Sequence, residues 1–452
     1  MSRVAIVTLG CPKNEIDSES LGGLLDAAGH DVGTDPTAAD VVVVNTCGFI
    51  DPARRETIEE VLDLVELKRS GDVKSVVLTG CLVARSATEL ADSLPEVDAF
   101  VDFAAYQDMS TIVTSLAEGT PTARIHGRPG HRFDPAWWDA AMAAGPRLRF
   151  GRRPWAYLKI AEGCDRGCTF CAIPLMRGKL RSRSAATIEA EARYLVAAGV
   201  SEVSLVSQDS VMWARDADGV GLASLLTRLG HIEGLRRIRL MYLHPQGVTE
   251  DLIAAMAASE VVVSYFDLSM QHVSPPVLKA MGRWGSRDRF ESMVERIRSW
   301  DPMAGIRATF ILGFPGETDH EAAEVESFVA ESDLDWIGVF QYSPEEGTRS
   351  FELESRVPSS IARERVERVA AAAELTMERR SRAVVGRTLE VLAEKRLPDD
   401  GMWIGRSHRE APEIDGEIRF TSIEPVAVGD YVDVRITGNE GADLVGVRSI
   451  PA

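Results

Sequence analysis

The chain has no long hydrophobic run, and it has too few basic residues to balance its acids. Its longest aliphatic runs, such as Val41 to Val44, fall far short of the roughly 20 residues that span a membrane. The apolar segment before Cys11 is too short for the core of an export signal, so we expect a cytoplasmic protein. With 50 Lys and Arg against 69 Asp and Glu, the net charge is −19. Such a surface repels nucleic acid unless a local basic patch intervenes.

Cysteine is scarce as well, with six among 452 residues. In a reducing cytosol, so few thiols are more often metal ligands or catalytic groups than disulfides. Cys164, Cys168 and Cys171 follow the spacing C-x3-C-x2-C, and no cysteine comes after Cys171. Structural zinc sites and ferredoxin-type cubes take four protein ligands. A zinc site completed by His244 or His272 is one interpretation. A cube on three thiolates, with one iron open to a small molecule, is the other.

The first part of the chain alternates short apolar runs with helical patterns. Over residues 1–125 this alternation predicts a parallel α/β sheet domain, with an amphipathic helical stretch from Ser18 to Ala28. Residues 126–153 are rich in Gly, Pro and Arg and are predicted to form a linker. Trp137 and Trp138 are its candidates for docking on a neighbouring domain.

The alternation of strands and helices resumes after the linker. Six strand–helix units within residues 154–382 predict a partial TIM-type barrel, whose active site would lie at the carboxyl ends of the strands. Residues 383–452 contain short alternating strands separated by Gly, Pro and Asp turns. This pattern is typical of a small β-barrel.

The other three cysteines each follow an apolar run in the N-terminal domain. Cys11 ends "VAIVTLGC", Cys47 ends "VVVVNTC" and Cys81 ends "SVVLTGC". Parallel strands end on the same edge of a sheet, where α/β folds bind ligands, so these thiols should converge. Cysteines at strand ends can also be small buried hydrophobes. Three such positions favour a second three-thiolate cluster.

The barrel cysteines, with the aromatic Phe170 just before Cys171, resemble the signature of radical S-adenosylmethionine enzymes. The resemblance implies that the open iron binds the amino and carboxylate groups of S-adenosylmethionine, with Phe170 near the cofactor. It also implies that one electron breaks the sulfonium bond and gives a 5′-deoxyadenosyl radical.

The whole chain, with two thiol triplets and a C-terminal barrel, resembles the methylthiotransferase family. The resemblance implies an N-terminal methylthiotransferase domain, a radical S-adenosylmethionine domain and a TRAM domain. It further implies two 4Fe–4S clusters, of which the N-terminal one carries the inserted sulfur. A first S-adenosylmethionine would donate the methyl group and a second would make the radical. The expected electron donor is a flavodoxin or ferredoxin.

Three strand ends of the barrel supply further candidates by the same resemblance. "ILGFPGET", with Gly313, resembles the segment behind the adenosyl group, and Gln208 with Asp209 occupies a position that contacts the amino acid end of the cofactor. Gln271 and His272 are candidates to line the substrate channel. Each of these residues is also compatible with an ordinary structural turn or a polar strand end.

Two acceptors are compatible with the family: an adenosine of transfer RNA, or the β-carbon of an aspartate in ribosomal protein uS12. The stretch "LGCPKNEIDSE" resembles the ribosomal-protein branch. Residues 383–452 hold eight Lys and Arg against thirteen Asp and Glu, a net charge of −5. Acids such as Glu413, Asp415 and Glu417 favour a basic protein over phosphates, unless they are merely a solvated surface. A non-enzymatic iron–sulfur or zinc protein that binds RNA is the alternative from another class.

Overall fold

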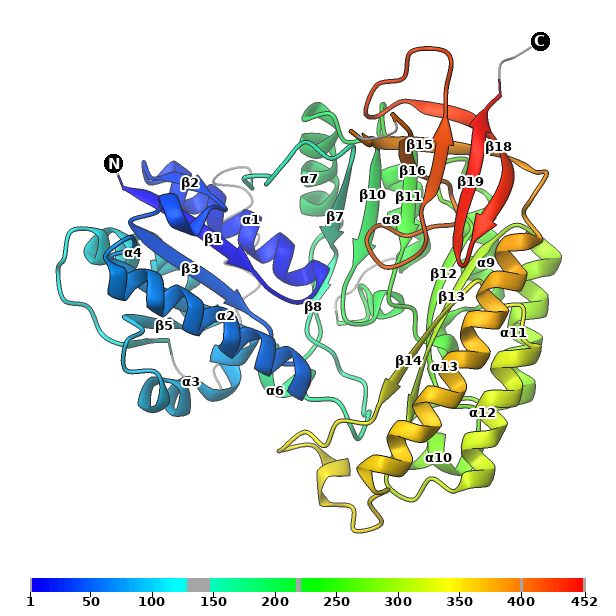
Figure 1. Cartoon of the computed structure of the whole chain (residues 1–452), viewed down its shortest axis with the longest axis horizontal. Helices are drawn as coiled ribbons and strands as arrows, with labels where there is room; N and C mark the ends of the chain where they lie inside the picture. The colour runs from blue at the N-terminus through cyan, green and yellow to red at the C-terminus, as the bar shows by residue number, and fades with distance from the viewer. Residues whose placement is uncertain (1, 128–146, 217–220, 399–400, 450–452) are drawn as a thin grey trace.

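A computed structural model describes residues 2–127, 147–216, 221–398 and 401–449. The chain forms three parts: an N-terminal α/β domain, a central open barrel and a small C-terminal barrel (Figure 1). Trp137 and Trp138 lie outside the described residues, so the docking predicted for them is not addressed. Of the helices that these ranges contain, none is long and apolar enough to cross a membrane.

The N-terminal domain is built on a six-stranded parallel sheet with the order β2-β1-β3-β4-β5-β6. Its strands are β1 (Arg3–Thr8), β2 (Asp31–Gly33), β3 (Val41–Thr46), β4 (Ser75–Gly80), β5 (Ala99–Val101) and β6 (Ile125–His126). Its helices are α1 (Pro12–Ala27), α2 (Asp51–Ser70), α3 (Cys81–Ser93) and α4 (Met109–Ala117). β3 and β4 are buried along their whole length, which explains their continuous apolar sequence. The predicted parallel sheet is confirmed.

Helix α1 begins at Pro12, six residues before the predicted start at Ser18. Proline at the first position favours helix initiation because its missing N–H would have no partner there. The additional turns are polar but buried, and they include Asn14 and Asp17. This polar half of α1 lies beside the central domain and its first strand. Tertiary contacts, rather than an apolar face, therefore fix the start of the helix.

The central domain contains six parallel strands in the order β7-β10-β11-β12-β13-β14. Between β11 and β12 the connection is made by two single bridges, Ile238 to Val262 and Leu243 to Leu268. The strands are β7 (Trp155–Lys159), β10 (Glu202–Val206), β11 (Arg237–Leu240), β12 (Tyr265–Gln271), β13 (Gly305–Leu312) and β14 (Trp336–Gln341). The helices are α6 (Ile173–Met176), α7 (Ala185–Ala197), α8 (Leu222–Gly230), α9 (Glu250–Ala257), α10 (Pro275–Ala280), α11 (Arg287–Trp300), α12 (Asp319–Glu331) and α13 (Ser359–Arg382). A short hairpin is formed by β8 (Ala161–Glu162) and β9 (Arg181–Ser182). Within the described ranges β7 and β14 do not pair, so the barrel is open, as predicted.

The C-terminal part is a closed five-stranded barrel, as predicted. Its strands are β15 (Thr388–Arg396), β16 (Trp403–Arg406), β17 (Ile418–Thr421), β18 (Tyr431–Glu440) and β19 (Asp443–Arg448). Two of its arginines are buried against the central domain: Arg406 pairs with Glu202 at 2.9 Å and Arg409 pairs with Asp335 at 2.7 Å. These buried ion pairs hold the small barrel on the central domain.

Asp415 corrects the simple picture of an acidic barrel surface. Its carboxylate is fully buried, pairs with Arg307 at 3.2 Å and accepts a hydrogen bond from the hydroxyl of Tyr265 at 2.6 Å. Glu413, two residues earlier, is half exposed. Asp415 is therefore a structural contact to the central domain, whereas Glu413 and Glu417 remain available to a partner.

Candidate functional site

The three N-terminal cysteines lie at one edge of the sheet. β1, β3 and β4 are parallel neighbours, and Cys11, Cys47 and Cys81 follow their carboxyl ends. Burial raises the pKa of the Cys81 thiol to about 12, and the nearby thiols Cys11 and Cys47 add to this rise. The predicted convergence of the three thiols is confirmed, and their role as cluster ligands stays a prediction.

The strand ends are tied together next to these thiols. Gly10 has a φ of +92°, and a Cβ at this position would lie 2.8 Å from Sγ of Cys47. Only glycine fits such a left-handed position beside a sulfur atom. The side chain of Asn14 donates to the carbonyls of Leu9 at 2.7 Å and Thr46 at 3.0 Å. The side chain of Asn14 and the close approach at Gly10 thus hold the segments that carry Cys11 and Cys47 together.

The barrel cysteines lie on the loop that joins β8 to α6, beyond the carboxyl end of the first barrel strand. The backbone N–H of Arg166 donates to Sγ of Cys164, and Nη1 of Arg283 donates to Sγ of Cys168, each at 3.4 Å. Burial raises the pKa of Cys164 to about 11 and that of Cys171 to about 12. Donors directed at sulfur atoms are typical of thiols that serve as thiolate ligands.

Arg177, which directly follows α6, connects the two sets of cysteines. Its Nε–H donates to Sγ of Cys81 at 3.2 Å. Its Nη2 donates to Oδ1 of Asn14 at 2.6 Å and to Oδ2 of Asp17 at 2.9 Å. Its Nη1 donates to Oε2 of Glu162 at 2.8 Å. A single buried guanidinium therefore contacts one thiol of the N-terminal set and the segment that leads into the barrel set.

Glu162 extends this network toward the barrel mouth. Nζ of Lys159 contacts Asp17 at 2.5 Å and Glu162 at 2.7 Å, and the side chain of Gln208 donates to Glu162 at 2.6 Å. Burial alone would raise the pKa of Glu162, but Arg177 and Lys159 hold it well below its usual range. The carboxylate is therefore ionised and orients the groups around it.

Gln208 has one amide atom in this network and one without a partner. Its Oε1 is buried and makes no hydrogen bond within the described residues. A buried polar atom without a partner is costly, so it is a natural contact for a ligand. Asp209 pairs with Arg166 at 2.7 Å through one oxygen, while its other oxygen is likewise unpaired among the described residues. The arrangement supports the predicted cofactor contact at Gln208 without testing it.

The two other predicted cofactor residues are Phe170 and Gly313. Phe170 packs against a small apolar cluster that contains Phe314, the neighbour of Gly313. Gly313 has a φ of +81°, and a Cβ there would lie 2.4 Å from Cβ of Ala362 in α13. Close packing against α13 thus accounts for this glycine, and its contact with a cofactor stays a prediction.

The histidines of the zinc alternative are engaged in local contacts. Nδ1 of His272 accepts the backbone N–H of Ser274 at 3.0 Å, and Nδ1 of His244 accepts that of Gln246 at 3.2 Å. Within the described ranges no three His, Cys, Asp or Glu side chains are grouped closely enough to hold one metal ion. In an iron–sulfur cube the thiolates bind different irons, so a cube does not require such a close group.

Cys11 lines a cavity of about 730 Å³. It lies between α1, Tyr157 of β7 and the loop that follows β16, which contributes Glu413 and Ile414. Its charged lining consists of three acids and one base: Glu15, Glu60, Glu413 and Arg153. Burial raises the pKa of Glu15 to about 7. The predicted channel residues Gln271 and His272 do not line this cavity.

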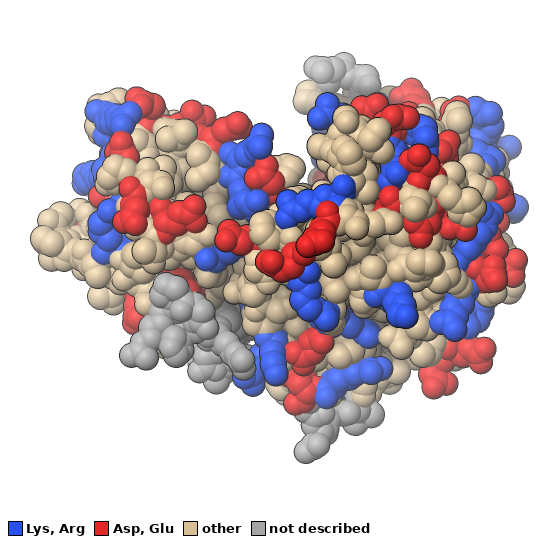
Figure 2. Space-filling model, turned by 90° about the horizontal axis from the view of Figure 1, so that it is seen from below, with Lys and Arg blue, Asp and Glu red and all other residues tan. Residues whose placement is uncertain are grey.

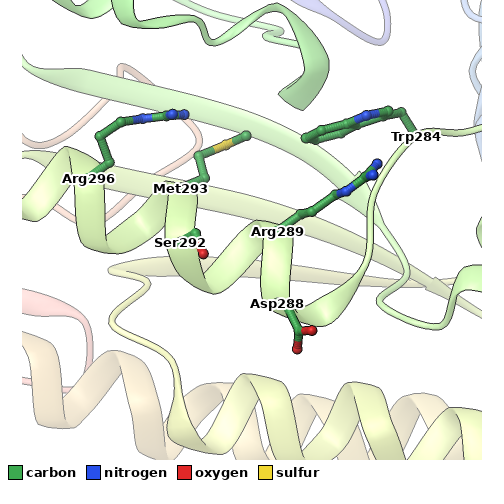
Figure 3. Close-up of a pocket in the computed structure, with 6 residues that line it drawn as sticks. All are labelled: Trp284, Asp288, Arg289, Ser292, Met293 and Arg296. Carbon is green, nitrogen blue, oxygen red and sulfur yellow. The ribbon is translucent and has the colours of Figure 1, made fainter.

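A second hollow lies on α11 and the loop before it, with a volume of about 300 Å³. Its side chains include Trp284, Arg289 and Arg296, and the guanidinium of Arg289 lies 5.1 Å from the ring centre of Trp284 (Figure 3). It contains none of the cysteines and is separate from the site described above.

Family models match three parts of the chain. The uncharacterized protein family UPF0004 matches residues 3–102, the radical SAM superfamily matches residues 158–329 and the TRAM domain matches residues 385–448. Among solved structures, the radical S-adenosylmethionine methyltransferase TsrM from Kitasatospora setae is similar in fold. Its TM-score is 0.55 at 18% identity, over 77% of each chain. The class of protein is thus a radical S-adenosylmethionine enzyme with a TRAM domain.

Relatives over the full length narrow this class. Ribosomal protein uS12 methylthiotransferase RimO from Kineococcus radiotolerans is 40% identical, and the match covers 98% of this chain and 96% of the relative. RimO from Streptomyces coelicolor is also 40% identical with the same coverage. The chain belongs to the RimO family of ribosomal protein uS12 methylthiotransferases.

The network around Arg177 was not predicted from the sequence. Asn14 and Asp17 lie far in the chain from Lys159 and Glu162, and the two pairs meet only when the two domains dock. One signal was present: the stretch "NEIDSES" opens a helix with polar residues on every side. A helix that is polar all round needs partners on several faces, and here the central domain supplies them.

Proposed function

We propose that this protein is a radical S-adenosylmethionine methylthiotransferase that replaces a hydrogen on the β-carbon of an aspartate of ribosomal protein uS12 with a methylthio group. The relatives at 40% identity carry the uS12 methylthiotransferase name. The proposed setting is the cytoplasm, where ribosomal proteins are modified, with a flavodoxin or ferredoxin as electron donor.

One observation carries the proposal: the chain has one set of three thiols in each of two domains, and Arg177 of the central domain donates to Cys81 of the N-terminal domain. A single radical site needs only one such set. The second set, in a separate domain, supplies a place for the sulfur that is transferred. We propose Cys11, Cys47 and Cys81 as ligands of one 4Fe–4S cluster, and the barrel cysteines Cys164, Cys168 and Cys171 as ligands of the other.

The residues present fit these groups. Hydrogen-bond donors reach the sulfur atoms of Cys81, Cys164 and Cys168, and such donors stabilise a thiolate that binds a metal. When bound, the barrel cluster with S-adenosylmethionine supplies the radical that removes the hydrogen, and the N-terminal cluster supplies sulfur. Gln208, with its unpaired Oε1, and Phe170 are proposed to position the cofactor.

The surface charge supports a basic protein as acceptor rather than a nucleic acid. Lys and Arg are interspersed with Asp and Glu over the face seen in Figure 2, which presents no continuous basic strip to a phosphate backbone. In the C-terminal barrel, Arg406 and Arg409 are buried in ion pairs, so they are not available to phosphates. Phosphate contacts dominate nucleic-acid affinity, and the cavity at Cys11 has a mostly acidic lining.

A separation of the two thiol sets tests the proposal. The triple variant with Cys11, Cys47 and Cys81 replaced by Ala should cleave S-adenosylmethionine to 5′-deoxyadenosine under a strong reductant, yet transfer no methylthio group. The matched triple variant of the barrel cysteines should make no 5′-deoxyadenosine. Full transfer by the first variant would exclude the N-terminal set as the sulfur site. Modification of transfer RNA, with uS12 unmodified, would exclude the proposed acceptor.

A further inference from the structure

Lys13 is a buried cation without an anionic partner. Its side chain is only 7% exposed, and it forms no ion pair or hydrogen bond with any residue that the structure describes. Its Nζ instead lies 3.0 Å from the ring centre of Tyr242, which follows β11 in the central domain. A desolvated ammonium gains part of its lost hydration from an aromatic face, yet it still lacks a counter-charge.

The position of Lys13 in α1 makes this arrangement more costly. Lys13 is in the first turn of the helix, where the helix dipole is positive and repels a cation. Natural sequences tend to keep such an unfavourable group only where function requires it. Lys13 therefore has a use that the folded chain alone does not reveal.

Among the acidic groups that act on Lys13 through space, the thiol of Cys11 has the largest effect, and the two carboxylates that follow it already have partners. Asp267 accepts the backbone N–H of Tyr242 at 2.9 Å and lies 3.6 Å from Arg307. Glu162 is held by Lys159 and Arg177 at 2.7 and 2.8 Å. Each of these carboxylates influences Lys13 through space without contacting it. No carboxylate of the described residues is therefore in contact with Lys13, and its N–H donors are left for a group from outside the chain.

The surroundings of Lys13 place that group at the reaction site. Lys13 lies two residues after Cys11, and Tyr242 follows the carboxyl end of a barrel strand. Tyr242 is a non-glycine residue with a φ of +58°, and strained backbone of this kind clusters at functional sites. An anion on Lys13 would thus be held between the N-terminal cysteines and the mouth of the barrel.

We propose that the ammonium of Lys13 binds the side-chain carboxylate of the acceptor aspartate and selects an anionic acceptor over a neutral one. This inference rests on the proposed function, because it assumes an aspartate as acceptor. The carboxylate carbon is bonded directly to the β-carbon, so a fixed carboxylate fixes the reacting carbon. Lys13 is then a substrate-binding residue whose role is distinct from that of the thiols.

The test compares two acceptors and three enzymes. The acceptors are uS12 and uS12 whose target aspartate is replaced by Asn, which has the same shape without the charge. The enzymes are the cluster-loaded protein with its own sequence, Lys13→Met and Lys13→Arg. Lys279→Met, on the exposed end of α10, is the matched control. Dissociation constants are measured without reductant, and 5′-deoxyadenosine formation is measured without uS12.

The unaltered protein should bind the aspartate form at least about tenfold more tightly than the Asn form, because the partner of a desolvated charge is lost. Lys13→Met should bind both forms equally, Lys13→Arg should keep most of the preference, and Lys279→Met should keep all of it. Formation of 5′-deoxyadenosine and iron content should not change in the control Lys279→Met.

Three results would overturn the inference. These are an unaltered protein that binds both forms equally, a Lys13→Met variant that keeps the preference, and a Lys13→Met variant whose KM for S-adenosylmethionine rises. The last result would assign Lys13 to the carboxylate of the cofactor. If the unaltered protein does not modify uS12 at all, the proposed function fails instead. The comparison of the two uS12 forms on the unaltered protein requires no variant enzyme, so it tests the inference even if Lys13→Met does not fold.

Discussion

Arg177 belongs to the central domain, yet its Nε–H donates to Sγ of Cys81 in the N-terminal domain at 3.2 Å. The same guanidinium contacts Glu162, two residues before Cys164. A positive charge and a hydrogen bond at a ligand sulfur favour the more negative, reduced form of an iron–sulfur cluster. The contact therefore couples domain docking to the electronic properties of the N-terminal site.

Replacement of Arg177 by Met should lower the reduction potential of the N-terminal cluster. The expected decrease is about 60 mV, the one-electron equivalent of a tenfold change in equilibrium. The measurement is a redox titration followed by electron paramagnetic resonance, in a background with the barrel cysteines replaced by Ala. Arg177→Lys should recover part of the potential, since it restores the charge but not the fork of donors. An unchanged potential in Arg177→Met would contradict the assigned contact.

The number of clusters should follow the two thiol sets independently. Replacement of all three barrel cysteines by Ala should remove about half of the iron and acid-labile sulfide, because the other set lies on a separate sheet, one side of which has a core made of N-terminal residues alone. The N-terminal triple variant should show the same loss. The number of clusters in each variant is measured by iron and sulfide analysis after anaerobic purification. A folded triple variant without any iron would mean that the two sets form one shared site.

Asp415→Lys should destabilise the protein, because it disrupts the contact between the C-terminal barrel and the central domain. The change removes the partner of Arg307 and places a second cation in a fully buried position. Loss of one member of a buried pair costs about 3–5 kcal/mol. Glu413→Lys, on the same loop but half exposed, should change stability by about 1 kcal/mol or less. Thermal unfolding of the two variants checks the difference, and equal melting temperatures would refute the assignment of Asp415 as buried.

Association with uS12 should weaken as salt rises, because exposed charge pairs are screened within about 10 Å at 0.1 M. Glu413→Lys and Glu417→Lys together should slow association by up to about tenfold at low salt and increase non-specific binding of transfer RNA. Glu424→Lys, which lies beyond the opposite end of β17 from Glu417, is the control and should have a smaller effect. The association rates are measured by stopped flow at several salt concentrations. Rates that change neither with salt nor with the Glu→Lys substitutions would argue against an acidic docking surface.

Much of the fold could be predicted from the sequence, because strand and helix patterns are local. The β3 run of four valines and the alternation in β18 indicate a buried strand and a half-buried strand, respectively, and both are observed. The convergence of Cys11, Cys47 and Cys81 followed from strand direction alone. The short strands β2, β5 and β6 were missed, since two or three residues carry no periodic signal.

The contacts between domains could not be predicted in this way. The contact of Asp415 with Arg307 could not be predicted from the sequence, because the stretch "EIDGE" is typical of an exposed acidic turn. Likewise, the burial of Lys13 depends on the ring of Tyr242, which lies 229 positions away in the chain. Such pairs form only when separately folded units dock, so they leave no trace in the spacing of either segment.

The mass of uS12 after reaction tests the central claim most directly. The cluster-loaded protein, S-adenosylmethionine and a strong reductant are incubated with uS12 and transfer RNA together. The account predicts an increase of about 46 Da on one aspartate of uS12, the sum for replacing H by SCH3, with the RNA unmodified. The same increase on an adenosine of the RNA, with uS12 unmodified, would contradict it.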